Sequence, residues 1–397
     1  MAVDGWRRSV VLWTLSLLVT VNQLVVRVLT PDASIARQGD ALVYLAGGRA
    51  LLGGQPLYAE RLELVYAEGS MPFTYPVFGA IVLSPFSLLQ VDVAAISLAV
   101  LSVACLVGTL AICVQHAKLP SWAIPVALPL ATMSDPVTNH LQLGQVNLLL
   151  MLLVVADLLW LRHTRFSGVG LGIAIAIKLT PAVFLLLLVI DRRWMTLVRA
   201  VTTFLVATGI GFLVRPSDSW EYWTRYLRDP GRVGNLTSPD NQSLRGLVER
   251  LITGPVGGGL WVVLVASTVA AIGWLLWRRI PDDCEVLRFG LASLVALMIS
   301  PISWSHHWVW AIPLVLGFAE WLRHHTSFLA AFVGLTLAVF SSQITNRIAA
   351  ESVHPLMDGY KLWMLPFSSP WVLWAIAGIA LCFVYDRGTA GVMRPAH

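Results

Sequence analysis

The stretch GVGLGIAIAIKLTPAVFLLLLVI, residues 168–190, decides the fold that the sequence predicts. It is apolar and long enough to cross a bilayer, but Lys178 and Pro181 stand near its middle. Proline removes a backbone donor and disfavours a helical residue before it, so we expect a break at KLTP. Basic turns mark the cytoplasmic side, and the turn at Arg192 and Arg193 follows directly. Given the other turns of the chain, it falls there only if the segment enters the membrane and returns, as a re-entrant pair of half-length helices.

The composition predicts a membrane protein. Of the 397 residues, 57% are hydrophobic and only 12% are charged, whereas about 25% is typical of soluble domains. The net charge of +5 is explained by basic turns on the cytoplasmic side, so we do not infer nucleic-acid binding. The four cysteines form no CxxC pair, so the sequence predicts neither a metal site nor a disulfide framework.

The apolar segments predict an all-α polytopic protein with a single membrane domain over residues 1–397. Candidate spans lie at 9–29, 92–115, 121–134, 146–161, 168–190, 196–214, 257–277, 286–302, 308–322, 328–345 and 370–386. With the re-entrant pair they give roughly twelve membrane helical segments, several of them short enough to be broken.

Loop charges orient these segments, because cytoplasmic loops carry an excess of Lys and Arg. The turns assigned to the inside contain Arg7 and Arg8, His116 and Lys118, Arg162 and Arg165, Asp191 to Arg193, Arg278 and Arg279, Arg323, and Arg387 and Arg394. Both termini are therefore expected in the cytoplasm. The outer side receives residues 30–90, 135–146, 215–256, 303–307 and 346–369. Most of the polar residues that need an explanation fall on that side.

The first outer segment, residues 30–90, contains a carboxylate at the start of an apolar run. Asp40 precedes a stretch that is compatible with a helix lying along the membrane interface. It serves there either as a helix N-cap or as a catalytic group. The PFTYP motif at Pro72–Pro76 follows and forms a rigid aromatic turn that contains Tyr75.

Amides and one lysine lie at membrane depth. Gln145 and Asn147 stand where a span re-enters the bilayer, and an unpaired amide there costs several kcal/mol. They either hold helices together or line a polar cavity. Lys178 is an ionisable group inside the membrane, which is a functional hypothesis by default, and its natural partner is an anion. The alternative for Lys178 is that it snorkels to an interface.

The long outer segment, residues 215–256, is basic and contains a helix start. DNQSLRG, residues 240–246, includes Asn241 and Gln242 and is typical of a capped helix N-terminus. The basic set is Arg225, Arg228, Arg232 and Arg245. These side chains are either solvated loop charges or ligands for the phosphate of an anionic lipid.

Tandem histidines occur in SPISWSHHWVWAIPL, residues 300–314. His306 and His307 lie between Trp304 and Trp308 at the outer end of a span. Imidazoles can donate to a phosphate, and the indole rings can flank a sugar or an isoprenoid. A metal site would need further ligands at suitable spacing, and adjacent histidines cannot readily bind one ion from a helix. Interfacial packing is the remaining interpretation.

Taken together, these motifs resemble the GT-C type glycosyltransferases that use polyprenyl-phosphate sugars, specifically glycosyltransferase family 87 of mycobacteria and relatives. The resemblance rests on GDALVYLAGGRALLGGQPLY from Gly39, PFTYP, LGQVNLLL from Leu143, AIKLTP from Ala176, NQSLRG from Asn241 and SPISWSHHWVW from Ser300. One departure is Val77, where many relatives carry a second proline. The resemblance implies a GT-C fold with short outer-face interfacial helices. It also implies a multi-pass enzyme of the plasma membrane with its active site on the outer face.

The resemblance implies an inverting transfer of mannose from polyprenyl-phosphate-mannose to a mannosylated phosphatidylinositol in α-1,2 linkage. Asp40 would act as the general base. The departing lipid phosphate would be held by His306, His307, Lys178 and Arg245. The side chains expected to contact the substrates are Tyr75, Gln145, Asn147, Asn241, Gln242, Trp304 and Trp308. Cationic side chains would replace a metal, so no cofactor is expected.

Two other functions remain open at this stage. An arabinofuranosyltransferase that uses polyprenyl-phosphate-arabinose needs the same amides, carboxylate and phosphate ligands, so the residues do not separate it from a mannosyltransferase. A lipid or solute transporter would explain the broken helix and Lys178. Against a transporter, the polar residues gather at one face, and the sequence contains no evident inverted repeat.

Overall fold

The computed structural model describes residues 2–29, 39–58, 62–63, 70–252, 254–323, 325–341 and 365–385. Most of the predicted outer segment 346–369, and the C-terminal arginines Arg387 and Arg394, lie outside these ranges. Within them the chain is helical, as predicted, except for one small ladder. Strand β1 (Leu62–Glu63) pairs antiparallel with β2 (Ser70–Met71) in the first outer segment. The all-α prediction did not include this pairing.

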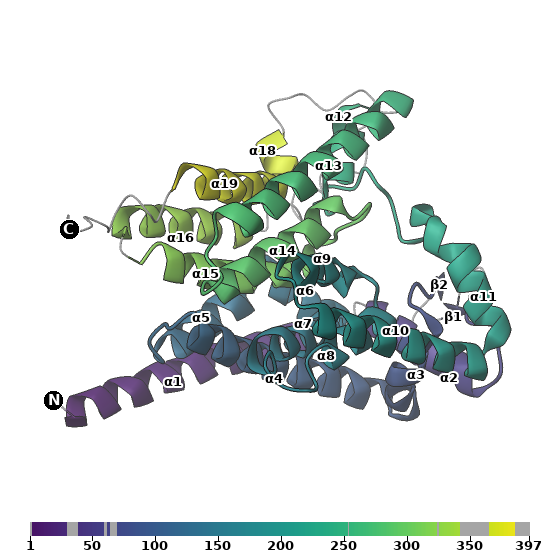
Figure 1. Ribbon diagram of the computed structural model, residues 1–397. Helices are drawn as coiled ribbons and strands as arrows, with labels where there is room; N and C mark the ends of the chain where they lie inside the picture. Colours follow the sequence, from purple (N-terminus) through teal and green to yellow (C-terminus); the bar gives the residue numbers. More distant parts are fainter. Residues whose placement is uncertain are drawn as a thin grey trace.

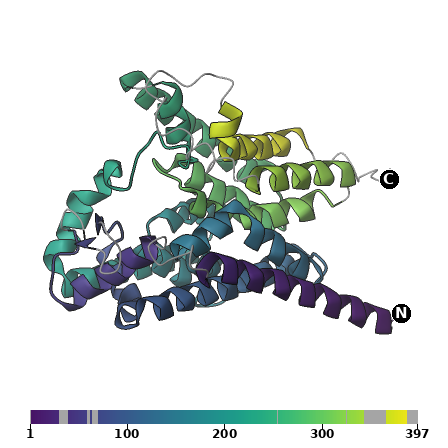
Figure 2. The same cartoon turned by 180° about the vertical axis from the view of Figure 1, so that it is seen from behind.

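The helices form two halves that lie one above the other (Figure 1). The lower half contains α1 (Ala2–Leu24), η1 (Val25–Leu29), α2 (Gly39–Leu52), α3 (Val77–Leu83), η4 (Ser84–Leu88), α4 (Val91–His116), α5 (Ala123–Met133), α6 (Asp135–Leu143), α7 (Asn147–Val155), η5 (Ala156–Trp160), α8 (Val169–Ile177) and α10 (Trp194–Val214). Seen from behind, α1 runs beside the other N-terminal helices, and it contacts α5 (Figure 2).

The upper half is built from the C-terminal helices. It contains α12 (Leu244–Leu251), α13 (Pro255–Arg278), α14 (Glu285–Ile299), η9 (Ser305–Trp310), α15 (Ala311–Trp321), α16 (Thr326–Phe340), α18 (Leu365–Ser368) and α19 (Pro370–Val384). The halves are joined by η6 (Thr180–Val183) and α9 (Phe184–Ile190), which contact α14, and by α11 (Pro216–Thr224), η7 (Tyr226–Arg228) and η8 (Pro230–Arg232).

The protein is a membrane protein. Among the described residues, three helices are long and apolar enough to cross a bilayer, namely α4, α10 and α13. A fourth candidate is the pair α6 and α7–η5, which is bent by 117°. The other apolar helices are shorter, so the predicted number of roughly twelve membrane segments remains a prediction.

The predicted break and return within residues 168–190 are present in the structure, and the insertion of this loop into the membrane remains a prediction. Helix α8 ends at Ile177, and Lys178 is extended, with φ −151° and ψ 127°. The chain then turns through η6 into α9 and comes back to its starting point. Nη2 of Arg193 donates to Oγ of Ser167 over 3.0 Å, so the two ends of the segment lie side by side. The break therefore holds Lys178 at the far end of a returning loop.

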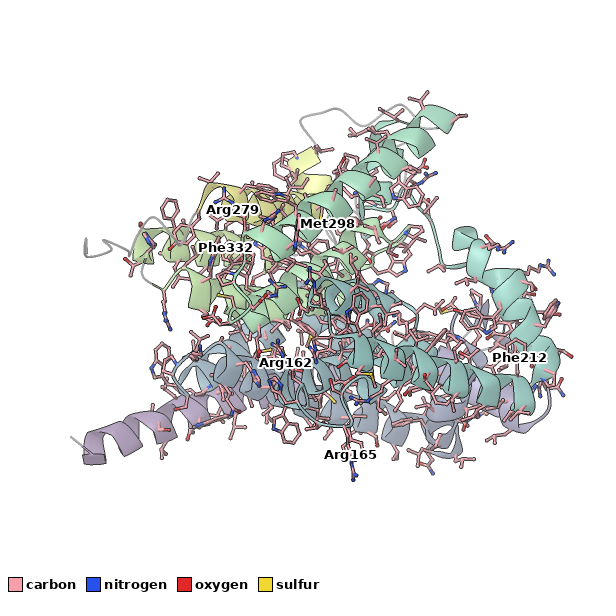
Figure 3. The ribbon with its side chains drawn as sticks, viewed as in Figure 1. Arg162, Arg165, Phe212, Arg279, Met298 and Phe332 are labelled. Carbon is pink, nitrogen blue, oxygen red and sulfur yellow. The ribbon has the colours of Figure 1, made fainter. Side chains whose placement is uncertain are left out.

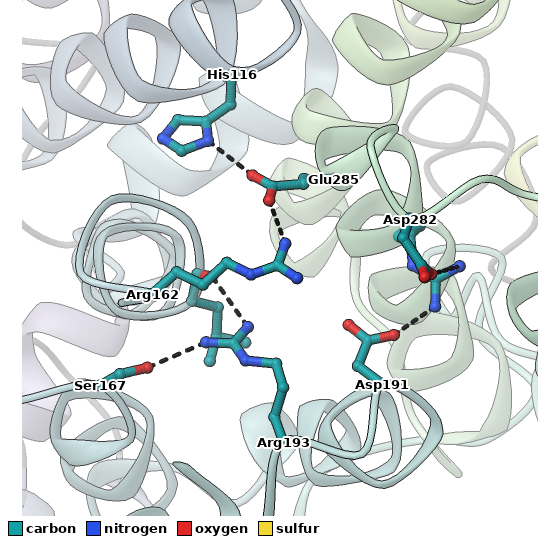
Figure 4. Close-up of polar contacts among 9 residues, drawn as sticks. His116, Arg162, Ser167, Asp191, Arg193, Asp282 and Glu285 are labelled. Atoms are coloured by element: carbon teal, nitrogen blue, oxygen red, sulfur yellow. Dashed lines mark hydrogen bonds and ion pairs between the residues drawn. The ribbon is translucent and has the colours of Figure 1, made fainter. Parts of the chain in front are cut away.

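Four of the turns that the sequence assigns to one side of the membrane lie together (Figure 4). Glu285 binds Nδ1 of His116 at 2.8 Å and also pairs with Arg162. Arg288 pairs with Asp191 in the same region. Figure 3 shows Arg162 between the halves, whereas Arg165 lies at the outer edge of the lower half. Four separate turns thus share the end opposite the polar motifs.

A second helix break lies between α6 and α7. The sequence predicts an outer turn over 135–146, and the structure forms most of it into helix α6. Gly144 ends α6 with φ +67°, and a Cβ there would lie 2.6 Å from Cβ of Ala41. Glycine is required by both the backbone angle and this close approach. The contact brings the following residue, Gln145, against α2.

The foot of the re-entrant loop supplies a stability test. Gly168 has φ +105°, and a Cβ there would lie 2.4 Å from the carbonyl oxygen of Thr196 on α10. We expect Gly168→Ala to lower the free energy of unfolding by at least about 1 kcal/mol, because both the backbone and the packing oppose a side chain. Thermal unfolding in detergent measures this effect.

The matched control is Gly209→Ala in the middle of α10, where a Cβ meets nothing within 4 Å. Alanine there should be neutral or stabilising by up to about 1 kcal/mol. Equal melting temperatures for the two variants would contradict the described packing at Gly168.

Candidate active site

A cleft of about 500 Å³ opens at the end of the structure where the polar motifs meet. Its walls come from the start of α2, the PFTYP turn, the two helix breaks, the loop after α11 and the segment before η9. This volume lies within the range of about 300–1,000 Å³ that is usual for ligand sites. Segments far apart in the sequence therefore form one site.

Asp40 provides the carboxylate of the cleft. It lies in the first turn of α2 and is half-buried. The rest of α2 is buried almost all round within the protein, so it does not have the exposed face of the predicted interfacial helix. Burial raises the pKa of Asp40, while a hydrogen bond from Gln145 and the positive charge of Lys178 lower it. A carboxylate with a raised pKa and a fixed partner is suited to take up a proton.

A tyrosine and glutamine network surrounds this carboxylate. Tyr44, one turn after Asp40, donates to Oε1 of Gln145 over 3.0 Å. The hydroxyl oxygens of Tyr44 and Tyr75 are 2.8 Å apart, and Tyr75 also donates to Gln145 over 3.4 Å. Tyr58 donates to the carbonyl oxygen of Tyr75 over 2.6 Å. The glutamine side chain is thus held in one orientation, with its amide nitrogen left to serve Asp40.

Lys178 provides a fixed cation in the same cleft. Nζ donates to Oδ1 of Asn147 over 3.0 Å and lies 3.3 Å from Nε2 of His307. It also lies 5.3 Å from the centre of the Tyr75 ring, a cation–π distance. These partners come from three different elements, so the ammonium group is aimed before a ligand arrives.

The tandem histidines lie beside Lys178 in the cleft. The rings of His306 and His307 meet edge to face, with centroids 4.6 Å apart, and both line the cleft. An ammonium group only donates, so Nε2 of His307 accepts from Lys178, and the ring proton lies on Nδ1. Burial, with the charge of Lys178, lowers the pKa of both rings. Both imidazoles are therefore neutral at pH 7.

The outer wall of the cleft comes from residues 222–234. Tyr222 and Tyr226 line it together with Arg232, whose Cζ lies 4.3 Å from the centre of the Tyr226 ring. Trp304 closes this side and packs against Gly234, where a Cβ would lie 2.5 Å from the indole ring. This wall is aromatic with a basic edge, which suits a sugar that carries a phosphate.

The structure brings together most of the residues that the sequence selected for the site. Those that line the cleft are Asp40, Tyr75, Gln145, Lys178, Trp304, His306 and His307. Asn147 lies beside them through its contacts with Lys178 and with the carbonyl oxygen of His306, at 3.2 Å. These placements agree with the predicted geometry, and the roles of the residues remain predictions.

Four selected residues do not lie in the cleft. Arg245 pairs with Glu249 on α12 and covers Trp261. Trp308 is fully buried against Trp371 and lines a separate apolar pocket. Asn241 and Gln242 are fully buried, and their amide groups bond to the protein backbone. The prediction placed these four side chains at the substrate site, and none of them lines the cleft.

Some residues of the cleft were missed as site residues. Tyr222 and Tyr226 line the cleft and were not selected, and Arg232 was assigned only to the basic set. Tyr44 does not line the cleft but bonds to Gln145, and it stands four residues after Asp40 on the same helix. That spacing is the signal that could have found Tyr44.

The arrangement defines a class of chemistry. A half-buried carboxylate at one position can accept a proton, while a lysine and neutral imidazoles at another can stabilise a developing anion. Within the described ranges, no three His, Cys, Asp or Glu side chains gather closely enough to hold a metal ion. The cleft is thus equipped for group transfer with an anionic leaving group.

Comparison with known proteins identifies the family. The model of glycosyltransferase family 87 matches residues 73–301, more than half of the chain. The chain belongs to this family and is a glycosyltransferase. It is 34% identical, over 72% of each chain, to the polyprenol-phosphate-mannose-dependent alpha-(1-2)-phosphatidylinositol mannoside mannosyltransferase of Mycobacterium tuberculosis.

One further relative is about as similar to this chain, and another is more distant. The polyprenol-phosphate-mannose-dependent alpha-(1-2)-phosphatidylinositol pentamannoside mannosyltransferase of Mycolicibacterium smegmatis is 35% identical over 72% of this chain and 69% of its own. An alpha-(1->3)-arabinofuranosyltransferase of Mycobacterium tuberculosis is 26% identical over 82% of this chain and 70% of its own. No solved structure matches the chain.

The pairing of charges across the cleft predicts a pH effect. Because Lys178 lowers the pKa of Asp40, removing its charge raises that pKa further, and the base is then ionised only at higher pH. We expect Lys178→Met to move the acid limb of the rate profile to higher pH. The rate at the optimum should also fall by about 10²-fold or more, because the ligand anion loses a fixed cation.

The control is the same substitution at Lys118, which is exposed in the turn after α4. Sugar transfer measured between pH 4 and pH 9 should give the wild-type profile for Lys118→Met. An acid limb that stays in place in Lys178→Met would refute the electrostatic link between Lys178 and Asp40.

Proposed function

We propose that the protein transfers mannose from polyprenyl-phosphate-mannose to a mannosylated phosphatidylinositol, in α-1,2 linkage and with inversion. The observation that carries the proposal is that Asp40 and the Lys178–His307 pair line the same cleft. The names of relatives at 34% and 35% identity support this donor and this type of acceptor. An arabinose donor remains the second candidate, supported by a relative at 26% identity. The transporter alternative does not suit a family of glycosyltransferases.

The chemistry assigns one step to each end of the cleft. Asp40 removes the proton of the acceptor hydroxyl as its oxygen bonds to the anomeric carbon. The bond between that carbon and the phosphate oxygen breaks on the opposite face, and the electron pair leaves with the lipid phosphate. Lys178 donates to the departing phosphate, and the neutral imidazoles of His306 and His307 are placed to assist. Attack from the face opposite the phosphate inverts the anomeric centre.

The reaction in this proposal needs no metal ion. The leaving group ends as a phosphate monoester anion, which is stable without coordination, and a lysine ammonium already neutralises part of its charge. The cleft also carries Arg232 at its outer edge as a second cationic side chain. We expect the enzyme to keep its activity in a chelator.

The proposal also includes a cellular location for the enzyme. The enzyme would lie in the plasma membrane with the cleft on the outer face and the N- and C-termini in the cytoplasm. The charged turns at the opposite end of the structure support this orientation, because cytoplasmic turns are enriched in Arg and Lys.

Removal of the base tests the proposal directly. Purified protein in detergent with EDTA receives labelled polyprenyl-phosphate-mannose and a phosphatidylinositol mannoside. We expect wild-type protein to form product and Asp40→Asn to lose about 10²- to 10⁴-fold in rate, because an amide cannot accept the proton. Asp92→Asn, at an exposed position in the first turn of α4, is the matched control and should keep the wild-type rate.

The other outcomes separate the alternatives. Product from arabinose donor alone would replace mannose in the proposal. Product from Asp40→Asn near the wild-type rate would remove Asp40 as the base. Loss of wild-type activity in EDTA that returns with a divalent cation would remove metal independence.

A further inference from the structure

The segment that carries the tandem histidines into the cleft has little structure of its own. Residues 300–304 are neither helix nor strand, and they connect α14 to η9. Buried backbone groups need hydrogen-bond partners, and an irregular segment cannot supply them internally. Ser303 is nevertheless almost completely buried. Something outside the segment must therefore hold it.

The partners come from the long outer segment. Oδ1 of Asn241 accepts from N–H of Ser303 over 2.9 Å, and its Nδ2 donates to the carbonyl oxygen of Pro301 over 3.1 Å. The backbone N–H of Gln242 donates to the carbonyl oxygen of Ser303 over 2.8 Å. Oγ of Ser243 donates to the carbonyl oxygen of Pro301 over 3.1 Å. Three consecutive residues thus bond to alternate residues of the segment.

The residue directly before His306 is held from another element. Oγ of Ser305, at the start of η9, accepts from Nδ2 of Asn139 on α6 over 2.9 Å. The histidine segment is therefore fixed on both sides of Trp304.

The outer segment is itself anchored on its far side. Nε2 of Gln242 donates to the carbonyl oxygen of Ser368 over 2.8 Å, and its Oε1 accepts from N–H of Trp371 over 3.2 Å. Nη1 of Arg250 donates to the carbonyl oxygen of Asn241 over 3.1 Å. The residues that hold the histidine segment are therefore rigidly supported from α12, α18 and α19.

We propose that Asn241, Gln242 and Ser243 are positioning residues that hold His306 and His307 at the phosphate end of the cleft. We call these three residues the clasp. This inference rests on the proposed function, because it gives the histidines a phosphate to meet. It also reassigns Asn241 and Gln242 from sugar contacts to control of the histidine segment. Fixed donors stabilise a developing charge only where their positions are held to within about 0.5 Å.

The test has one arm that is independent of catalysis. Hydrogen–deuterium exchange followed by mass spectrometry reports the protection of the amides in residues 300–307. We expect Asn241→Ala and Ser243→Ala to speed exchange in this segment about tenfold or more and to leave α2 unchanged, because each removes hydrogen bonds to the backbone of Pro301 or Ser303. Asn235→Ala, an exposed change in the same loop, is the control.

The second arm measures kinetics on the same purified proteins. Asn241→Ala and Ser243→Ala should each lower kcat about tenfold with KM for the acceptor unchanged, because the acceptor does not touch the histidines.

Each outcome decides a different statement. Unchanged exchange in Asn241→Ala and Ser243→Ala would overturn the clasp itself. Faster exchange with an unchanged kcat would overturn its role in positioning the histidines. Wild-type protein that transfers neither mannose nor arabinose would count against the proposed function, and the exchange result would still decide whether the clasp holds the segment.

Discussion

The structure depends on the requirement that a lysine inside a membrane protein must have partners. Lys178 stands at the tip of a loop that leaves one end of the molecule and returns to it. An unpaired ammonium group inside a membrane protein is strongly disfavoured. Asn147 and His307 meet this demand, and they come from opposite halves of the protein. The interactions that stabilise the lysine therefore also join the halves and define the polar end of the cleft.

Two helix breaks form the site around this lysine. The break at Lys178 exposes an extended residue, and the break at Gly144 presents Gln145 toward Asp40. Regular helices bond their own backbone groups and offer only side chains to a ligand. A helix break inside a membrane is tolerated only where protein surrounds it or a polar cavity adjoins it. Both breaks lie beside the same cleft, so the irregular backbone and the polar side chains share one location.

Local sequence was sufficient for the features that arise from local physics. The proline after Lys178 predicted the break, and the basic turn at Arg193 predicted the return. Asp40 was placed correctly at the start of a helix. The number of spans was less predictable, because several apolar helices are shorter than a bilayer is thick. The β1–β2 ladder consists of two-residue strands, too short to leave a periodic pattern.

The amides show why the site was predicted only in part. Gln145 and Asn241 are both polar residues beside apolar helices, and composition gives them the same interpretation. One faces a cleft, and the other is buried against Pro301 and Ser303, about sixty residues further along the chain. The segment that packs opposite an amide is determined by the tertiary fold, and a local sequence pattern does not reveal it. An amide that holds a histidine in place also differs from one that touches a sugar in what its loss would do. The first changes the rate through the geometry of another residue, whereas the second changes the affinity for substrate itself.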